Sequence, residues 1–515
     1  MTEIYDVIIV GGGPVGAALA IELGLNKIKT LVLEKYTTPL LSPRAQSLNE
    51  RTMELFMRWG LVDKMRASTL LPKDYPMQGV WCSKLNGITY GAAGSGQQIT
   101  ESMTAQKPIR IPLYITENIL REKISSLKSI TFLKERLVES VAVESDQDLV
   151  SVTAKNKLNN TTEKYFAKFV VGCDGANSIT RKMVDIKFEG LAPKRRVINV
   201  LFESPDLHSK ITVENGFIYY LLENKMLTVI GPVDLNKGIW YASIGYGDDK
   251  KTIDEIDVEQ LIETLTGIQF TKKILNKHFW DMQIQLAEYF SKDNRVFLMG
   301  DAAHAFSPTG GFGLNTGFGD VTNLAWKLAS VIHQKSSDQI LNTYEIERRP
   351  IALRNLQAAE KNAADAFAVR TQFPPDKEPQ KFADENVRIA KQHTHVAGIT
   401  LGYTYNSNEN AISASEYIPT AKPGYFLPHK KINDKVIYEL LSPTHWTLIV
   451  SGKEKIKFQI NNLKILHVPE NTYLSRYILI RPDWHIAIAS DSITEGVLKS
   501  YFDTVNAKTK KEQQF

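Results

Sequence analysis

One stretch of the chain combines a carboxylate, a glycine-rich turn and a helix start in an order suited to binding a flat, anionic ligand. Residues 295–299 form a short apolar run that predicts a buried strand ending before Asp301. Glycines are frequent at 310–313, and apolar residues at helical spacing then predict a helix from about Gly313 to His333. Glycine lets the backbone approach a ligand closely, and a helix start favours negative charge.

The amino-terminal segment carries the glycine pattern of a βαβ dinucleotide fold. Apolar runs at 4–10 and 30–33 predict two strands, and residues 17–25 predict the helix between them. The turn reads Gly-x-Gly-x-x-Gly, and an acid follows the second strand, where it can accept hydrogen bonds from ribose hydroxyls. This context predicts a dinucleotide without choosing between NAD and FAD. The predicted contacts here are Gly11, Gly13, Pro14, Val15, Gly16, Glu34 and Lys35.

Two further segments supply residues for the same ligand. Arg44 follows a proline turn and precedes a helix predicted at 49–59, and its planar cation suits a phosphate or a ring edge. The apolar run at 168–172 predicts a strand that ends before Asp174 and Gly175. Asp174 is also suited to capping the helix that follows, and the two roles are compatible.

Together these segments resemble the class A FAD-dependent aromatic-ring hydroxylases, of the p-hydroxybenzoate hydroxylase type, in the branch of phenol and polyketide hydroxylases. The matches are Gly300-Asp301-Ala302-Ala303-His304, Pro308, Gly310-Gly311, Gly313, Asn315, Gly317, Asp320 and residues 323–328, with the segments around Arg44 and Asp174-Gly175. Their number and fixed spacing make coincidental turns a poor explanation.

The resemblance implies a role for each matching residue. Asp301 would contact the ribityl chain of FAD, and Pro308 would lie beside the isoalloxazine. The helix start, with Gly311, Gly313, Leu314 and Asn315, would face flavin N1 and O2. Arg44 would contact the flavin, and Asp174 with Gly175 would serve FAD or NAD(P)H binding. Where relatives usually carry Gln, this chain has Leu113, which removes one side-chain hydrogen bond.

The resemblance and the strand pattern predict an α/β fold in six segments. A Rossmann-like FAD-binding domain of the p-hydroxybenzoate hydroxylase type would comprise residues 1–75, 111–185 and 291–395, the last with long helices. A mostly antiparallel substrate sheet, inserted into it, would comprise residues 76–110 and 186–290. Residues 396–515 resemble a thioredoxin-like carboxy-terminal domain, and they lack the Cys-x-x-Cys pair that redox activity would need.

The strands of the predicted substrate sheet carry aromatic side chains, of which Tyr220 and Trp240 are the predicted substrate contacts. Each also has a plainer explanation as a core or sheet-surface residue. The sequence identifies no catalytic base, because His304 lies within the flavin motif and is expected to support its loop. No spacing of His, Cys or Asp predicts a metal site.

Composition excludes several classes of protein. The net charge of +5, from 62 basic and 57 acidic residues, is spread along the chain and does not favour nucleic-acid binding. Two cysteines exclude a disulfide framework and fit a reducing cytoplasm. No secretory signal is expected, nor any apolar stretch of membrane-spanning length. A homodimer is compatible with the sequence.

The resemblance implies an FAD-dependent monooxygenase that uses NADPH or NADH and O2 to insert one oxygen atom into a phenolic or polyketide-like ring through a flavin C4a-hydroperoxide. The protein would supply orientation and electrostatics to the cofactor's chemistry. A Baeyer–Villiger or epoxidising monooxygenase acting on a polyketide or antibiotic is one alternative. A second alternative is a flavin-binding module without catalytic activity, and Leu113 is the only feature of the sequence that favours it. A flavin-dependent halogenase is not indicated, because no Trp-x-Trp-x-Ile-Pro sequence occurs.

Overall fold

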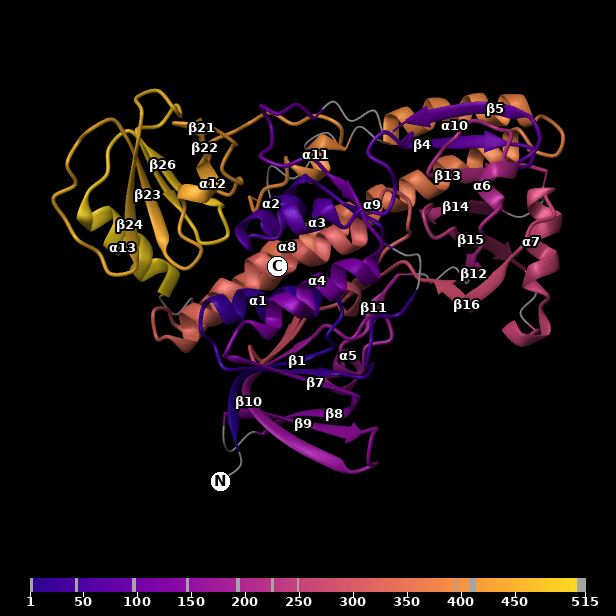
Figure 1. The fold of residues 1–515 in the computed structure, drawn as a ribbon. Helices are drawn as coiled ribbons and strands as arrows, with labels where there is room; N and C mark the ends of the chain where they lie inside the picture. Colours follow the sequence, from indigo (N-terminus) through magenta and orange to yellow (C-terminus); the bar gives the residue numbers. More distant parts are fainter. Residues whose placement is uncertain are drawn as a thin grey trace.

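A computed structural model of the chain describes residues 3–41, 45–94, 99–144, 148–190, 195–223, 227–247, 250–393, 396–406 and 414–506. These residues form a large central region, a sheet region at one end and a smaller sheet region at the other (Figure 1). The sheet region at one end has a separate hydrophobic core. The core of the central region continues into the carboxy-terminal region, which also has a smaller core on its other side.

The central region is built on an eight-stranded sheet. Its main path runs β18-β19-β10-β1-β2-β7, and β8 and β9 continue it beside β10. β1 pairs in parallel with both β10 and β2, and its continuous apolar run fits a strand with both faces covered. The strands are β1 (Ile4–Val10), β2 (Thr30–Glu34), β7 (Ile130–Lys134), β8 (Arg136–Glu144), β9 (Leu149–Asn156), β10 (Thr162–Gly172), β18 (Ser291–Lys292) and β19 (Val296–Leu298).

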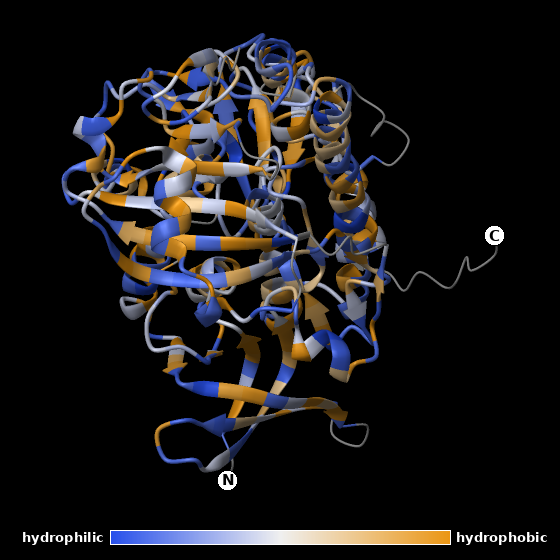
Figure 2. Cartoon of the chain, turned by 90° about the vertical axis from the view of Figure 1, so that its right-hand side faces the viewer, coloured by the Kyte–Doolittle hydropathy of each residue, from blue (hydrophilic) through white to orange (hydrophobic). Residues whose placement is uncertain are grey.

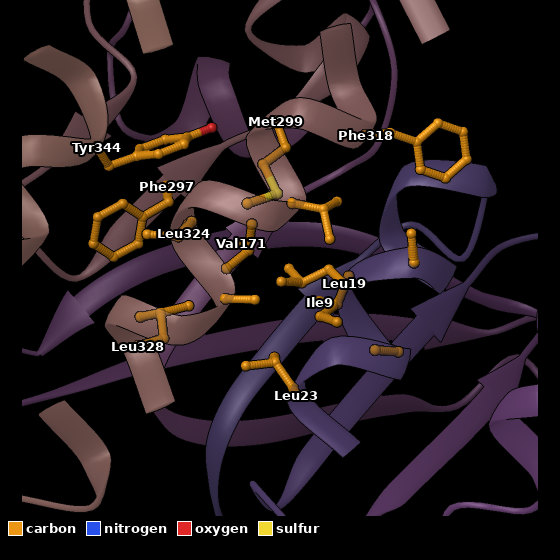
Figure 3. Close-up of a cluster of buried hydrophobic side chains, with 14 of the residues drawn as sticks. Ile9, Leu19, Leu23, Val171, Phe297, Met299, Phe318, Leu324, Leu328 and Tyr344 are labelled. Atoms are coloured by element: carbon orange, nitrogen blue, oxygen red, sulfur yellow. The ribbon is translucent and has the colours of Figure 1, made fainter. Parts of the chain in front are cut away.

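Long helices cover this sheet. In α1 every residue from Gly16 to Gly24 is buried, because the helix packs between α4 and α8. Its side chains there are small or apolar except Glu22, whose carboxylate accepts from Trp59 Nε1 at 2.7 Å and from Arg58 at 3.0 Å. Figure 3 shows the side chains of Leu19 and Leu23 gathered with Leu324, Leu328 and strand residues in one core. The helices of this region are α1 (Pro14–Leu25), α2 (Glu50–Arg58), α3 (Val62–Ala67), α4 (Leu113–Ser125), α5 (Ile179–Met183), α8 (Phe312–Ile332), α9 (Asn342–Gln372) and α11 (Ala397–Thr400). α10 (Pro379–His393) packs instead against α9 and against β5 of a second sheet (Figure 1).

Short strand pairs connect the central region to the second sheet. β3 (Ser47–Leu48) pairs with β6 (Ile109–Arg110), while β17 (Gln285–Ala287) pairs with both β11 (Phe188–Glu189) and β20 (His304–Ala305). Through these pairings, the chain segments that lead into and out of the second sheet lie beside the segments that carry the flavin motifs.

The second sheet has seven strands in the order β16-β12-β15-β14-β13-β4-β5, all antiparallel except the β13–β4 pair. One face packs on α7 through a core that includes Trp240, and hydrophilic and hydrophobic residues alternate along the strands (Figure 2). The elements are β4 (Gln78–Cys82), β5 (Thr89–Gly94), β12 (Arg195–Glu203), α6 (Leu207–Lys210), β13 (Ile218–Leu221), β14 (Thr228–Asp234), β15 (Ile239–Tyr246), α7 (Val258–Thr266) and β16 (Lys273–Met282).

The carboxy-terminal region holds a four-stranded mixed sheet, ordered β24-β23-β25-β26. It docks on the central region through an edge-to-face contact between Trp326 and Trp446 and an ion pair of 2.6 Å between Arg481 and Glu347. The elements are β21 (Lys431–Ile432), β22 (Lys435–Val436), α12 (Ile437–Leu440), β23 (Trp446–Ser451), β24 (Leu463–Val468), β25 (Tyr477–Ile480), β26 (Ile486–Ser490) and α13 (Glu495–Asn506).

The structure confirms the predicted strands at 4–10 and 30–33 and the helices at 49–59 and 313–333 to within one or two residues. The sequence analysis did not predict β16 or α10. Among the described residues, no helix combines the length and the apolar character that crossing a membrane would require.

Candidate functional site

The first glycine turn leaves space for a ligand at one position and is tightly packed at the two others. A Cβ built on Gly11 would lie 2.5 Å from the Cys173 carbonyl oxygen, and one on Gly16 would lie 2.0 Å from the Gly11 carbonyl oxygen. A Cβ on Gly13 would meet nothing within 4 Å. Gly13 is also the N-cap of α1, and no side chain caps it. The turn therefore fits a pyrophosphate placed at the helix start.

Glu34 is held in a fixed orientation beside this turn. Its carboxylate accepts hydrogen bonds from the backbone N–H of Gly12 at 2.6 Å and of Tyr36 at 2.8 Å, and the residue is 5% exposed. Each oxygen keeps further acceptor capacity, which suits the ribose hydroxyls of a dinucleotide. The neighbouring Lys35 is exposed, with its ammonium over the ring of Tyr36.

The second motif is organised by a buried carboxylate. Asp320 accepts from the backbone N–H of Gly300 at 3.2 Å and from the Arg348 guanidinium at 2.9 Å, and it lies 2.7 Å from His304 Nε2. All three side chains are buried, and the Arg348 and His304 contacts keep the pKa of Asp320 below its usual range although burial opposes this. Asp320 thus fixes the turn that presents Asp301. His304 supports this loop, as its place in the motif predicted.

The start of α8 is partly exposed. Gly310 and Gly311 have φ of +93° and +67°, which the left-handed turn before the helix requires. Pro308 and Gly311 are exposed, while Gly313 and Leu314 are half-buried in the first turn. No side chain caps this 21-residue helix, and its first turn carries no acid. Its free N–H groups are therefore suited to negative charge.

Asn315 joins two of the predicted flavin segments. Its side-chain carbonyl accepts from the Asn49 N–H at 3.0 Å and the Thr52 hydroxyl at 2.7 Å, and its amide donates to the Ser47 carbonyl at 3.1 Å. Asn315 therefore fixes the segment after Arg44 against α8. Arg44 itself lies outside the described residues.

At the third motif the N-cap of α5 is Ser178, whose hydroxyl accepts from the Arg181 N–H at 2.9 Å, and Asp174 supports this helix start. The Asp174 carboxylate accepts from the Ser178 hydroxyl at 2.5 Å and from the Thr180 N–H at 3.0 Å, at the start of α5. Gly175 has φ of +83°, and a Cβ there would meet nothing within 4 Å. Leu113 opens α4 and is 6% exposed, so an apolar, buried side chain occupies the position for which the resemblance implies Gln.

Comparison with known proteins assigns the chain to a family. A model of the family described as FAD binding domain matches residues 4–359. The chain belongs to this family. The open space at Gly13, the oriented Glu34 and the uncapped α8 start fit FAD, which is the cofactor of the protein.

The two relatives of this FAD-binding protein described next are both named as monooxygenases. It is 28% identical over 412 residues to 2,4-dichlorophenol 6-monooxygenase of Delftia acidovorans, covering 75% of this chain and 68% of the relative. It is 27% identical over 508 residues to rifampicin monooxygenase of Streptomyces venezuelae, covering 95% and 97%. Among solved structures, the rebeccamycin biosynthetic enzyme RebC with reduced flavin matches with a TM-score of 0.85 at 27% identity, covering 98% of this chain and 99% of RebC.

Beside the flavin motifs of this FAD-binding protein lies one face of the seven-stranded sheet. Tyr220 stacks on Trp81 at 4.8 Å, and burial raises the pKa of Tyr220 to about 12. Burial also raises the pKa of Tyr241, which contacts Arg110 of β6. The Arg110 guanidinium donates to the Gln46 side chain at 2.7 Å, near the segment that Asn315 holds. This face therefore brings aromatic hydroxyls and one cation next to the flavin segments.

Trp240 lies on the opposite face of the same sheet. It is 0% exposed and belongs to the core packed against α7. Strand alternation explains this, because Trp240 and Tyr241 are consecutive and must point to opposite faces. Its burial argues against substrate contact, and we leave Trp240 out of the proposed site.

Sequence reasoning missed the roles of two arginines. Arg348 bonds Asp320 of α8, and nothing in its local sequence indicated this partner. Arg110 was not singled out at all. Its position just before the Leu113 segment was the available signal, because two of its tyrosine neighbours, Tyr220 and Tyr241, come from residues more than 100 positions away.

Proposed function

We propose that the protein is an FAD-dependent NAD(P)H:O2 monooxygenase that inserts one oxygen atom into a phenolic or polyketide-like aromatic molecule. The observation that carries the proposal is family membership over residues 4–359 together with a built flavin cradle, in which Asp320 and Asn315 fix its two loops. The names of the relatives, a dichlorophenol monooxygenase and a rifampicin monooxygenase, support this reaction class.

The residues of this chain would bind and orient the cofactor. Gly13 and the α1 start receive the pyrophosphate, and Glu34 receives the adenosine ribose. Asp301 meets the ribityl chain, and Pro308 with Gly311 to Asn315 borders the ring, as the resemblance implies. When bound, FAD supplies hydride acceptance from NAD(P)H and activation of O2. The α8 start stabilises negative charge on the ring by about 0.3–2 kcal/mol through the helix dipole.

The seven-stranded sheet would supply the substrate wall. Tyr220, Tyr241 and Arg110 lie on the face nearest the flavin segments, where they can contact an aromatic ring and its oxygens. Packing of α10 against Trp81 and Tyr220 closes one end of this face against water. A site that excludes water limits the loss of reactive intermediates through side reactions with water.

We also propose the domain assignment given by the sequence. Residues 1–75, 111–185 and 291–395 would form the FAD-binding domain, and residues 76–110 and 186–290 the inserted substrate sheet. Residues 396–515 would form a thioredoxin-like domain, supported by one parallel and two antiparallel pairings in its four-stranded sheet. Cytoplasmic location and homodimer formation stay predictions.

The decisive experiment measures NADPH and NADH oxidation by the FAD-loaded protein with a panel of phenols, aromatic acids and polyphenolic antibiotics, and records product masses. One compound should accelerate oxidation and gain one oxygen atom. Hydroxylation, Baeyer–Villiger oxidation and epoxidation each add one oxygen atom and give products of equal mass, so the structure of the product is then determined by NMR spectroscopy. A lactone or an epoxide would indicate the Baeyer–Villiger or epoxidising alternative. A yellow protein whose slow oxidation no compound changes would refute the proposal and favour the silent flavin-binding module.

A further inference from the structure

Arg110 of β6 is a half-buried cation whose hydrogen-bond partners in the described part of the chain are all uncharged. Its Nε and Nη2 donate to the Gln46 side-chain oxygen at 3.2 and 2.7 Å, and its Nη1 donates to the Phe217 carbonyl at 3.2 Å. The Tyr241 hydroxyl also interacts with the guanidinium. A guanidinium has five N–H groups, so two remain for the Tyr241 hydroxyl and for a ligand.

The positive charge of Arg110 is not balanced by its neighbours. Arg110 forms no ion pair among the described residues, whereas Arg51 and Arg348 pair with carboxylates at 2.7 and 2.9 Å. The adjacent tyrosines do not supply a negative charge near neutral pH, because burial raises the pKa of Tyr220 to about 12 and also raises the pKa of Tyr241. A cation partly removed from water is costly without an anion, and the fork of an arginine suits an anionic oxygen.

A glycine allows Tyr241 and the contacts of Arg110 to come together on the sheet. A Cβ on Gly231 would lie 2.8 Å from Tyr241 Cε1 and 2.4 Å from the Phe217 carbonyl oxygen, to which Arg110 donates. Tyr220 pairs with residue 229 of β14 and Tyr241 with residue 231, so both rings lie on one face. This face is therefore an aromatic wall with a single cation at its edge.

Arg110 also lies beside a segment that carries a flavin motif. Its backbone pairs with Ser47, whose carbonyl accepts from the Asn315 amide at 3.1 Å. Asn315 belongs to the first turn of α8, where the resemblance implies the flavin ring. A ligand held by Arg110 would thus lie between the aromatic wall and the flavin segments.

We propose that Arg110 determines substrate specificity by binding an anionic oxygen of the aromatic substrate, either a carboxylate or an ionised phenolic oxygen. This inference rests on the proposed monooxygenase function and narrows its substrates to acidic aromatic molecules. A neutral ring of the same shape would leave the guanidinium without an anion and would bind less tightly.

The test measures ligand binding to the FAD-loaded protein by calorimetry without NAD(P)H, so that no turnover occurs. Aromatic acids are compared with their amides and phenols with their methyl ethers, including 2-naphthoic acid with 2-naphthamide and 4-nitrophenol with 4-nitroanisole. At least one anion should bind about tenfold more tightly than its neutral counterpart. A preference for acids over amides identifies a carboxylate. A preference for phenols over ethers that grows as pH rises through the pKa of the phenol identifies a phenolate.

Substitution of Arg110 separates its role from that of the surrounding fold. Arg110→Gln removes the charge and should abolish the preference for anions without changing FAD affinity, whereas Arg110→Lys should keep part of the preference. Arg66→Gln is the matched control and should leave the preference unchanged. Arg66 of α3 is also half-buried and likewise donates to a glutamine side chain and a carbonyl, those of Gln106 at 3.2 Å and Lys107 at 2.8 Å.

Three results would overturn the inference: a wild-type protein that binds no anion better than its neutral counterpart, a preference that survives in Arg110→Gln, or a loss of FAD in Arg110→Gln. Failure of the proposed function is distinguishable from each of them. Anions that bind through Arg110 but never gain an oxygen atom in the turnover assay would support this site and refute the monooxygenase reaction.

Discussion

The buried carboxyl group of Glu50 should make the stability of the protein fall as pH rises. Glu50 opens α2, is 0% exposed, and neither of its oxygens has a hydrogen-bond partner among the described residues. Burial raises the pKa of Glu50 from 4.5 to about 7. At 1.36 kcal/mol per pKa unit, this rise in pKa corresponds to about 3 kcal/mol of destabilisation once Glu50 is ionised in both the folded and the unfolded protein.

The sign of this pH dependence follows from which state of the protein, folded or unfolded, binds the Glu50 proton more tightly. The folded protein binds it better than the unfolded chain between pH 4.5 and 7, so the stability that Glu50 contributes is fully present below pH 4.5. That contribution is lost as pH rises through 7. Glu50→Gln removes the charge and keeps the shape. It should raise the thermal midpoint at pH 8 by roughly 3 °C and leave it unchanged near pH 4.5, measured on FAD-loaded protein.

Glu54→Gln is the matched control on the next turn of α2. Glu54 is also 0% exposed, but it accepts from Arg51 at 2.7 Å and from Thr104 and Ala105 at 2.8 and 2.9 Å. Neutralising it leaves Arg51 buried without its partner, so stability should fall by about 3–5 kcal/mol at pH 8. If Glu50→Gln also destabilised the protein at pH 8, Glu50 would have a partner in the holoenzyme, and the reasoning would be refuted.

Four further substitutions test the flavin cradle. Gly13→Ala should fold normally and weaken FAD binding, measured by flavin fluorescence, whereas Gly16→Ala should lower the thermal midpoint, because its Cβ would lie 2.0 Å from a carbonyl oxygen. Asp320→Asn leaves the buried Arg348 without its carboxylate and should lower the free energy of unfolding by about 3–5 kcal/mol. It should also speed the release of FAD. Unchanged FAD retention would contradict the positioning role of Asp320. Leu113→Gln should tighten FAD binding by up to about tenfold if the usual glutamine contact forms, and equal affinity would show that it does not.

The parts of the fold that the sequence could predict are those fixed by local pattern. The βαβ unit around Gly11 to Gly16 has glycine spacing and apolar runs that only one backbone path satisfies, and α8 has both a helical period and a glycine-rich start. The face of the sheet on which a strand residue lies was harder to predict. Tyr220 and Trp240 looked alike in sequence, yet only Tyr220 lies on the face beside the flavin segments, because register depends on pairing with distant strands.

Charged residues on α9 show why ion-pair partners could not be predicted from spacing. Glu347 and Arg348 are adjacent and looked like one local face, but consecutive helix positions point in different directions. Glu347 bonds Arg481 of the carboxy-terminal region at 2.6 Å and Lys327 of α8 at 2.7 Å, and these cations lower the pKa of Glu347 to about 2 despite its burial. Arg348 bonds Asp320, which holds the Gly300 turn. Two neighbouring residues of one helix thus tie the carboxy-terminal region and the flavin loop to the same rigid element.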